Sequence, residues 1–301
     1  MNRIVRFAVV PIVSAIAAAA LASSPAVAGV IDVTPVNMGD WAFANSDGNL
    51  VVGNNPTGVG GMVYGPGTPP IGIGSANLAT GNGTSGGDGG EELSTTGYAG
   101  VALSSLTALN YSTFVTQNNG SQFPYLVLEI ATGLSGVDAY DQLFFEPPYQ
   151  TPGTGNPSLP NQGATGLNEW QSWNALVGGL WDNDGIAGCG SPGSGVSSLA
   201  SCIAAIEALG GDPTIANTRG NGDLDGVGGI YFQVGESDPT DIFNGYVDDF
   251  TIGVNGVDTT YNFDPVAEPA SLPLLGAGLL GFVLVWRRNR GKTQDSGGLN
   301  A

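Results

Sequence analysis

The stretch Tyr246–Phe263, YVDDFTIGVNGVDTTYNF, decides the fold. It holds two runs rich in β-branched and aromatic residues, at 246–254 and 259–263, and a polar turn that contains a glycine separates them. Such residues suit the pleated surface of a β-strand, so we predict two strands here. Adjacent side chains on a strand point to opposite faces, and we therefore interpret the pair Asp248-Asp249 as structural.

Runs of the same kind recur along the chain between polar, glycine-rich turns. With 50 glycines and 19 prolines, the composition favours many short strands over helices. The 42% hydrophobic content, with aromatic residues spread along the body, favours a folded domain over disorder. The further strands that we predict lie at 41–44, 49–53, 98–103, 108–115, 125–131, 142–146 and 230–235.

The segment 197–209 departs from this pattern. Leu199, Cys202, Ile203 and Ile206 recur at helical spacing, and two glycines and then an Asp-Pro pair follow. We predict one short surface helix here. The predicted fold is therefore a mainly antiparallel β-sandwich with one surface helix, formed by the body 29–265.

The first 28 residues have the features of a signal peptide. Arg3 and Arg6 precede an apolar stretch, and Ala26-Val27-Ala28 forms a small-residue cleavage signal, so Gly29 is the predicted mature start. A membrane anchor that is not cleaved is the alternative. In both cases the body is exported.

Export makes a disulfide the natural state of the two cysteines, Cys189 and Cys202, which are 13 positions apart. The chain contains no histidine that could activate a cysteine thiol, which argues against a catalytic cysteine.

The chain ends in an apolar segment, 272–286, which is followed by Arg287, Arg288, Arg290 and Lys292. Fifteen helical residues rise about 22 Å, short of the ~30 Å hydrocarbon core of a bilayer, and snorkelling arginines can close part of that gap. We predict a transmembrane helix with its basic end inside the cell. A buried core helix is the alternative.

The order of features in this tail resembles a PEP-CTERM sorting signal. Glu268-Pro269 precedes the apolar helix, and Arg287-Arg288 follows it. Ala267 stands where the family has its first proline. The resemblance covers 266–292, ahead of a short polar end at 293–301. It implies an exported protein of a Gram-negative bacterium that is held in the inner membrane before exosortase, a membrane protease, processes it for the cell surface or the exterior.

The body is strongly acidic. All but two of the 26 acidic residues lie between 29 and 266, where Arg219 is the only basic residue. Such a surface repels a phosphate backbone, which argues against nucleic acid as a partner.

Acidic residues also suit calcium. In NGDLDG, 221–226, Asn221, Asp223 and Asp225 alternate before a glycine, as in the front half of an EF-hand loop. Phe232 stands where that loop has its glutamate. The spacing predicts a calcium site, and an ordinary Asp-Gly turn is the alternative.

Two kinds of site on the body concern polysaccharides. Trp170, Trp173 and Trp181 offer flat faces to sugar rings, although Trp170 and Trp173 are three positions apart and so face opposite sides of a strand. A glycosidase needs two convergent carboxylates, commonly spaced E-x-D-x-x-E in jelly rolls, and no such triplet occurs. Without histidine, a Ser-His-Asp triad and a histidine zinc site are excluded.

The order of strands over 70–265 is similar to that of concanavalin-like or laminin-G-like jelly rolls of bacterial secreted proteins, which supports the fold more than an activity. The hypothesis from sequence is a non-catalytic component of the cell surface or extracellular matrix that binds glycan. A polysaccharide-degrading enzyme with a dispersed carboxylate site and a purely structural matrix protein are the alternatives.

Overall fold

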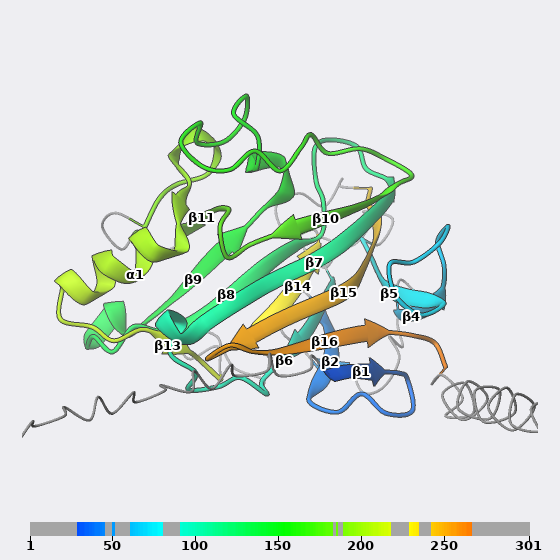
Figure 1. The fold of residues 1–301 in the computed structure, drawn as a ribbon, viewed down its shortest axis with the longest axis horizontal. Helices are drawn as coiled ribbons and strands as arrows, with labels where there is room; N and C mark the ends of the chain where they lie inside the picture. Colours follow the sequence, from blue (N-terminus) through cyan, green and yellow to red (C-terminus); the bar gives the residue numbers. More distant parts are fainter. Residues whose placement is uncertain are drawn as a thin grey trace, which may run out of the picture.

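The structure is a computed structural model, and it describes residues 29–45, 50–51, 61–80, 91–182, 185, 189–217, 229–234 and 242–266. Within these ranges the chain forms two β-sheets and one α-helix (Figure 1). The predicted signal peptide, the sorting tail from Ala267 onward and the polar end lie outside the described residues. No helix in the described part is long and apolar enough to cross a membrane.

The first sheet is built around the long strand β15, which pairs antiparallel with β5, β7 and β16. The edge strand β1 pairs parallel to β16, from Gly29 beside Thr259 to Val33 beside Phe263. The described strands of this sheet are β1 (Gly29–Val33), β4 (Gly61–Tyr64), β5 (Gly74–Ala79), β7 (Leu106–Gln117), β10 (Trp170–Asn174), β15 (Asn244–Val254) and β16 (Val257–Phe263).

The second sheet is antiparallel in every described pair, in the order β12-β11-β9-β8-β14-β6-β2-β3, with β13 beside β8. Its strands are β2 (Trp41–Asn45), β3 (Leu50–Val51), β6 (Glu91–Thr95), β8 (Tyr125–Ala131), β9 (Tyr140–Phe145), β11 (Gly179–Asp182), β12 (Ser197–Ser198), β13 (Thr214–Ile215) and β14 (Ile230–Val234). Short 3-10 helices lie at η1 (Leu103–Ser105), η2 (Gly136–Ala139), η3 (Pro147–Tyr149) and η4 (Gly193–Gly195).

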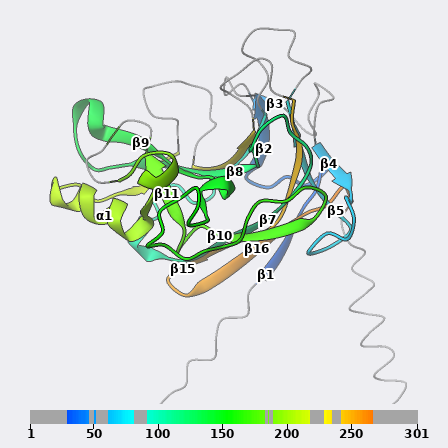
Figure 2. The same cartoon turned by 90° about the horizontal axis from the view of Figure 1, so that it is seen from above.

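The two sheets form separate layers, with β15 and β16 in one and β8 and β9 in the other (Figure 2). An aromatic core fills the space between them. Trp41 from β2 makes edge-on contacts with Phe250 and Phe263 of the first sheet, at ring-centroid distances of 5.8 and 5.0 Å. Edge-to-face packing of this kind is favoured by aromatic quadrupoles. The prediction of a mainly β, two-sheet fold is confirmed, and the jelly-roll arrangement stays a prediction.

The helix α1 (Leu199–Ala208) lies at one end of the sandwich, as Figures 1 and 2 show. Ser198 caps it by accepting a hydrogen bond from the amide of Ser201, and Gly210, with φ of 91°, follows its end. Leu199, Cys202 and Ile206 are buried, as the helical spacing predicts. A disulfide joins Cys202 to Cys189, so both the helix and the disulfide are confirmed.

One predicted strand is wrong. Residues 98–103 form turns and an isolated bridge between Ala102 and Thr214. The amide of Gly100 donates to the carbonyl of Ile215 at 2.7 Å, and the amide of Leu103 donates to that of Pro213. Leu103 enters the core and Tyr98 and Val101 pack against it, although the backbone here forms no regular strand.

Candidate functional site

The three candidate glycan-binding tryptophans lie in three different environments. Trp173 is only 2% exposed and belongs to the core, where its indole nitrogen donates to Thr113 Oγ1 at 2.8 Å. Trp170 is partly buried on the other face of the first sheet and donates to the carbonyl of Pro66. Trp181 lies in β11 of the second sheet. The expectation that Trp170 and Trp173 face opposite sides is confirmed, and the three rings do not share one surface.

Trp181 belongs to a second apolar cluster, separate from the core. In β8 and β9, Leu126, Leu128, Leu143 and Phe145 enter the core, so alternate residues must face away from it. The cluster on that side consists of Tyr125, Val127, Phe144, Trp181 and Tyr231. We call it the aromatic face.

Strand register sets the aromatic face in a row. Phe144 lies opposite both Trp181 and Val127, and Val127 lies opposite Tyr231, so the row crosses β11, β9, β8 and β14. The rings of Trp181 and Phe144 are stacked, with centroids 4.3 Å apart and planes 11° apart. Tyr125 follows at 6.1 Å from Phe144. Trp181 and Tyr125 are partly buried and keep some exposed surface, whereas Phe144 is almost fully covered.

Polar side chains accompany these rings. The indole nitrogen of Trp181 donates to Glu146 Oε1 at 2.8 Å, and burial raises the pKa of Glu146 above its usual value. Gln142 donates from Nε2 to Glu129 Oε2 and to the hydroxyl of Tyr231, both at 2.9 Å. Gln142 and Glu146 are partly buried, while Glu129 is fully buried. The accessible surface therefore combines the rings of Trp181 and Tyr125 with the amide of Gln142 and the carboxylate of Glu146.

Sequence reasoning named Trp181 but missed the residues that surround it. The alternation within 125–131 indicates that Tyr125 shares a face with Glu129, and the same holds for Phe144 with Glu146 further on. These two pairs could therefore be predicted from the sequence. The register that sets β8 beside β9 and β9 beside β11 joins distant segments, and the sequence pattern does not predict it.

The predicted calcium ligands Asn221, Asp223 and Asp225 lie outside the described residues, so calcium binding stays a prediction. Phe232, at the twelfth position, is buried in β14. In the described part of the chain, no three or more His, Cys, Asp or Glu side chains are grouped so that they could hold a metal ion.

The sorting residues Glu268, Pro269, Arg287 and Arg288 also lie beyond the described part, and here a comparison with known families is decisive. The model of the PEP-CTERM protein-sorting motif matches residues 265–289. The protein is therefore sorted through its C-terminal tail to the exterior, and the motif implies processing by exosortase, a membrane protease. No curated protein and no solved structure matches the chain.

Proposed function

We propose that the protein is a non-catalytic, glycan-binding component of the cell surface or of the extracellular polysaccharide matrix, and that the aromatic face is its binding surface. One observation carries this proposal. Trp181 keeps exposed surface while its ring is fixed by stacking on Phe144 and by its bond to Glu146. A ring that is already held in place loses little conformational entropy on binding.

The chemistry of the face suits a sugar chain. The C–H faces of sugar rings pack on flat aromatic rings, and Trp and Tyr supply such rings with a polar edge. Sugar hydroxyl groups can donate to the carboxylate of Glu146 and to the amide oxygen of Gln142, whose nitrogen already donates to Glu129 and Tyr231. Trp181 and Tyr125, which both contact Phe144, are the two rings that keep exposed surface for an extended chain.

The positions of the carboxylates support a non-catalytic role. Glu129 lies opposite Gln142, and Glu146 is four residues further along from Gln142. Glycosidases need two carboxylates that both face the scissile bond. Here Glu129 is fully buried and accepts from Gln142, while Glu146 accepts from Trp181, which supports binding over hydrolysis.

The proposal extends to the route of the protein. We propose that the signal peptide is removed before Gly29 and that the apolar segment 272–286 holds the precursor in the inner membrane of a Gram-negative cell until its release. The two-sheet architecture supports the jelly-roll assignment, a fold class in which one sheet face commonly serves binding. A purely structural matrix protein remains the rival, and it requires no ligand.

A glycan array probed with the purified protein tests the proposal. We expect binding to one class of extracellular polysaccharide, and we expect Trp181→Ala to weaken it at least tenfold. The reason is that removing a central aromatic anchor from a binding surface typically costs about 1–2 kcal/mol or more.

Trp170→Ala is the matched control because Trp170 is also partly buried but lies on the first sheet. We expect it to leave glycan affinity unchanged. Equal losses in the two variants, or an array without any bound glycan, would contradict the assignment of the aromatic face. Release of reducing ends by the wild-type protein would instead favour the enzyme.

A further inference from the structure

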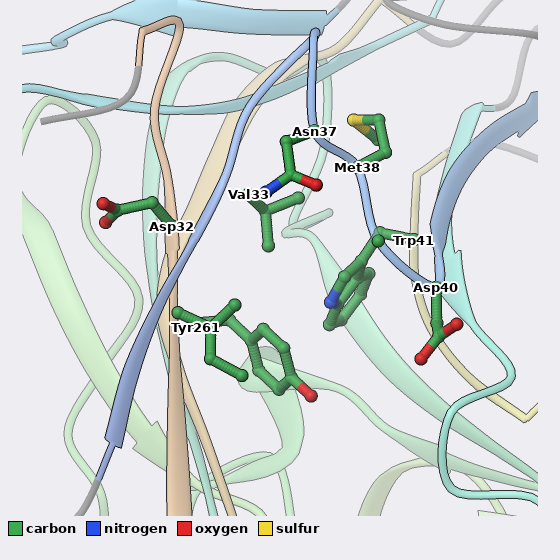
Figure 3. A pocket seen from close by; sticks show the side chains of 9 residues that line it. Asp32, Val33, Asn37, Met38, Asp40, Trp41 and Tyr261 are labelled. Atoms are coloured by element: carbon green, nitrogen blue, oxygen red, sulfur yellow. The ribbon is translucent and has the colours of Figure 1, made fainter.

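A pocket of about 170 Å³ lies where β1 and β16 meet the start of β2 (Figure 3). We call it the Trp41 pocket. Ile31 and Val33 of β1, Tyr261 of β16 and Trp41 form much of its wall. Asn37 and Asp40 come from the exposed segment that joins β1 to β2. The pocket belongs to the edge of the sandwich and shares no residue with the aromatic face.

Trp41 presents an unusual group to this pocket. The residue is only 4% exposed, and its buried indole N–H has no hydrogen-bond partner within the part of the chain that the structure describes. Figure 3 shows the indole nitrogen turned toward the space between Val33 and Tyr261. The other described tryptophans, Trp170, Trp173 and Trp181, all donate to an oxygen. A buried donor without a partner is unfavourable, so an acceptor that enters the pocket can form a hydrogen bond that the described residues do not provide.

The surrounding charges restrict that acceptor. Asp32 and Asp40 both border the pocket and disfavour an anion. Ammonium and guanidinium groups suit the two carboxylates but carry no acceptor for the indole N–H, and aliphatic side chains carry none either. What remains is a neutral group with oxygen acceptors, such as a hydroxyl, an ether or an amide carbonyl.

The size and the lining narrow the choice to a sugar ring. A cavity of about 150 Å³ binds benzene in another protein, so the Trp41 pocket, which is about 170 Å³ and partly open, has room for one ring whose substituents extend to the rim. The apolar walls suit its C–H groups, while Asn37 and Asp40 at the rim suit its hydroxyls. Asp32 points away from Trp41 and accepts from Asn262 at 2.9 Å, so Asp40 is the carboxylate left for the ligand.

We infer that the Trp41 pocket is a second glycan site, which binds one neutral pyranose residue at a chain end or branch through the Trp41 indole N–H. The inference rests on the proposed function, because it assumes that the protein meets polysaccharide. It assigns different parts of the glycan to the two sites. The aromatic face binds along an extended sugar chain, and the pocket binds a single sugar ring. Two such sites on one protein would raise its avidity for a matrix polymer.

The indole N–H groups provide separate reporters for the two sites. In ¹⁵N-tryptophan-labelled protein, each indole gives its own NMR signal, which Trp41→Phe and Trp181→Phe assign by loss. We expect titration with glucose, galactose, mannose and N-acetylglucosamine to shift the Trp41 signal saturably for at least one sugar. The signal of Trp173, which is buried and already bonded, should stay in place.

A surface variant supports the test without changing the core. The double variant Asn37→Ala with Asp40→Ala should bind the sugar that shifts the Trp41 signal about tenfold more weakly, because two hydrogen bonds are lost. Glu207→Ala, on the exposed side of α1, should leave that affinity unchanged. A Trp41 signal that stays fixed with every sugar overturns the inference, and so does a saturable shift with N-methylacetamide alone, which would assign the pocket to peptide.

The two proposals fail separately. If oligosaccharides move Trp181 while no monosaccharide moves Trp41, the aromatic face stands and the pocket inference is overturned. If Trp41 responds and Trp181 does not, the pocket inference is supported and the aromatic face is contradicted.

Discussion

Replacing Glu91 with glutamine is expected to stabilise the protein at alkaline pH and to flatten the fall of its unfolding free energy between about pH 5 and 8. Glu91 is 4% exposed in β6 and accepts a hydrogen bond from the amide of Ala79 in β5, so its carboxyl group links the two sheets. Burial raises the pKa of Glu91 to about 8.

The direction of this pH dependence follows from the pKa of Glu91 in the unfolded and folded states. The unfolded chain releases the proton near the ordinary pKa of 4.5, whereas the folded protein keeps it up to about pH 8. Between these values the folded state holds the extra proton, so the stability present below about pH 4.5 is lost as the pH rises through the folded pKa. Each pH unit in this window is worth about 1.4 kcal/mol, which gives a loss of about 3–4 kcal/mol between pH 5 and 8.

Urea unfolding at a series of pH values measures this loss. Glutamine keeps an oxygen for the amide of Ala79 but cannot ionise, so the variant should lose less stability with rising pH. Glu207→Gln, on the exposed surface of α1, should follow the wild type. Burial also raises the pKa of Asp248 to about 7, so part of the slope below pH 7 should persist. Identical slopes for wild type and Glu91→Gln would contradict the buried position of this carboxyl group.

Changing Cys189 and Cys202 together to alanine is expected to lower the free energy of unfolding by about 3 kcal/mol. The disulfide closes a loop across a sequence separation of 13, and breaking it gives that entropy back to the unfolded chain. Both cysteines are fully buried, and alanine avoids placing new hydroxyls there. The loss should centre on α1, whose amides should exchange faster in hydrogen-exchange experiments while those of the sheets stay protected.

Wild-type protein in reducing agent is the control, and it should lose a similar amount of stability. Thiol titration of the denatured, non-reduced protein should find no free thiol. Two free thiols, or equal stability with and without reductant, would show that the bond does not form in the exported protein.

The elements that sequence predicted best depend on local chemistry. Helix α1 follows from apolar spacing and a glycine stop, and β8 from an almost continuous apolar run at 125–131. The turn between β15 and β16 is local as well. Asn255 and Gly256 both have positive φ, at 52° and 79°, as a tight hairpin with an Asn-Gly turn requires.

The elements that escaped prediction depend on distant partners. β6 begins with Glu91 and Glu92, and adjacent acids are not a strand signal, yet both are buried because β2 and β14 flank the strand. β1 is short and exposed at its start, and it is held by parallel pairing with residues 259–263, more than 220 positions away. The same limit applied to the aromatic face, whose rings come from four strands.

The adjacent carboxylates of β15 show what the local sequence pattern can and cannot predict. The pair Asp248-Asp249 was interpreted as structural, and Asp248 indeed accepts from the amides of Phe263 and Ile71. Its neighbour Asp249 has a φ of 54°, where the register of β15 against β7 shifts. The alternation rule alone does not show such a bulge, because one extra residue changes which face each later side chain takes.

The central claim is that the protein reaches the exterior through its C-terminal tail, and the intact mass of protein released from cells tests it most directly. We expect a chain that starts near Gly29 and ends near Glu268-Pro269 in cells that contain an exosortase, because the PEP-CTERM motif matches residues 265–289. Cells without the exosortase should retain the longer form in the membrane fraction. Released protein that still carries Trp286 and the arginines after it would contradict the account.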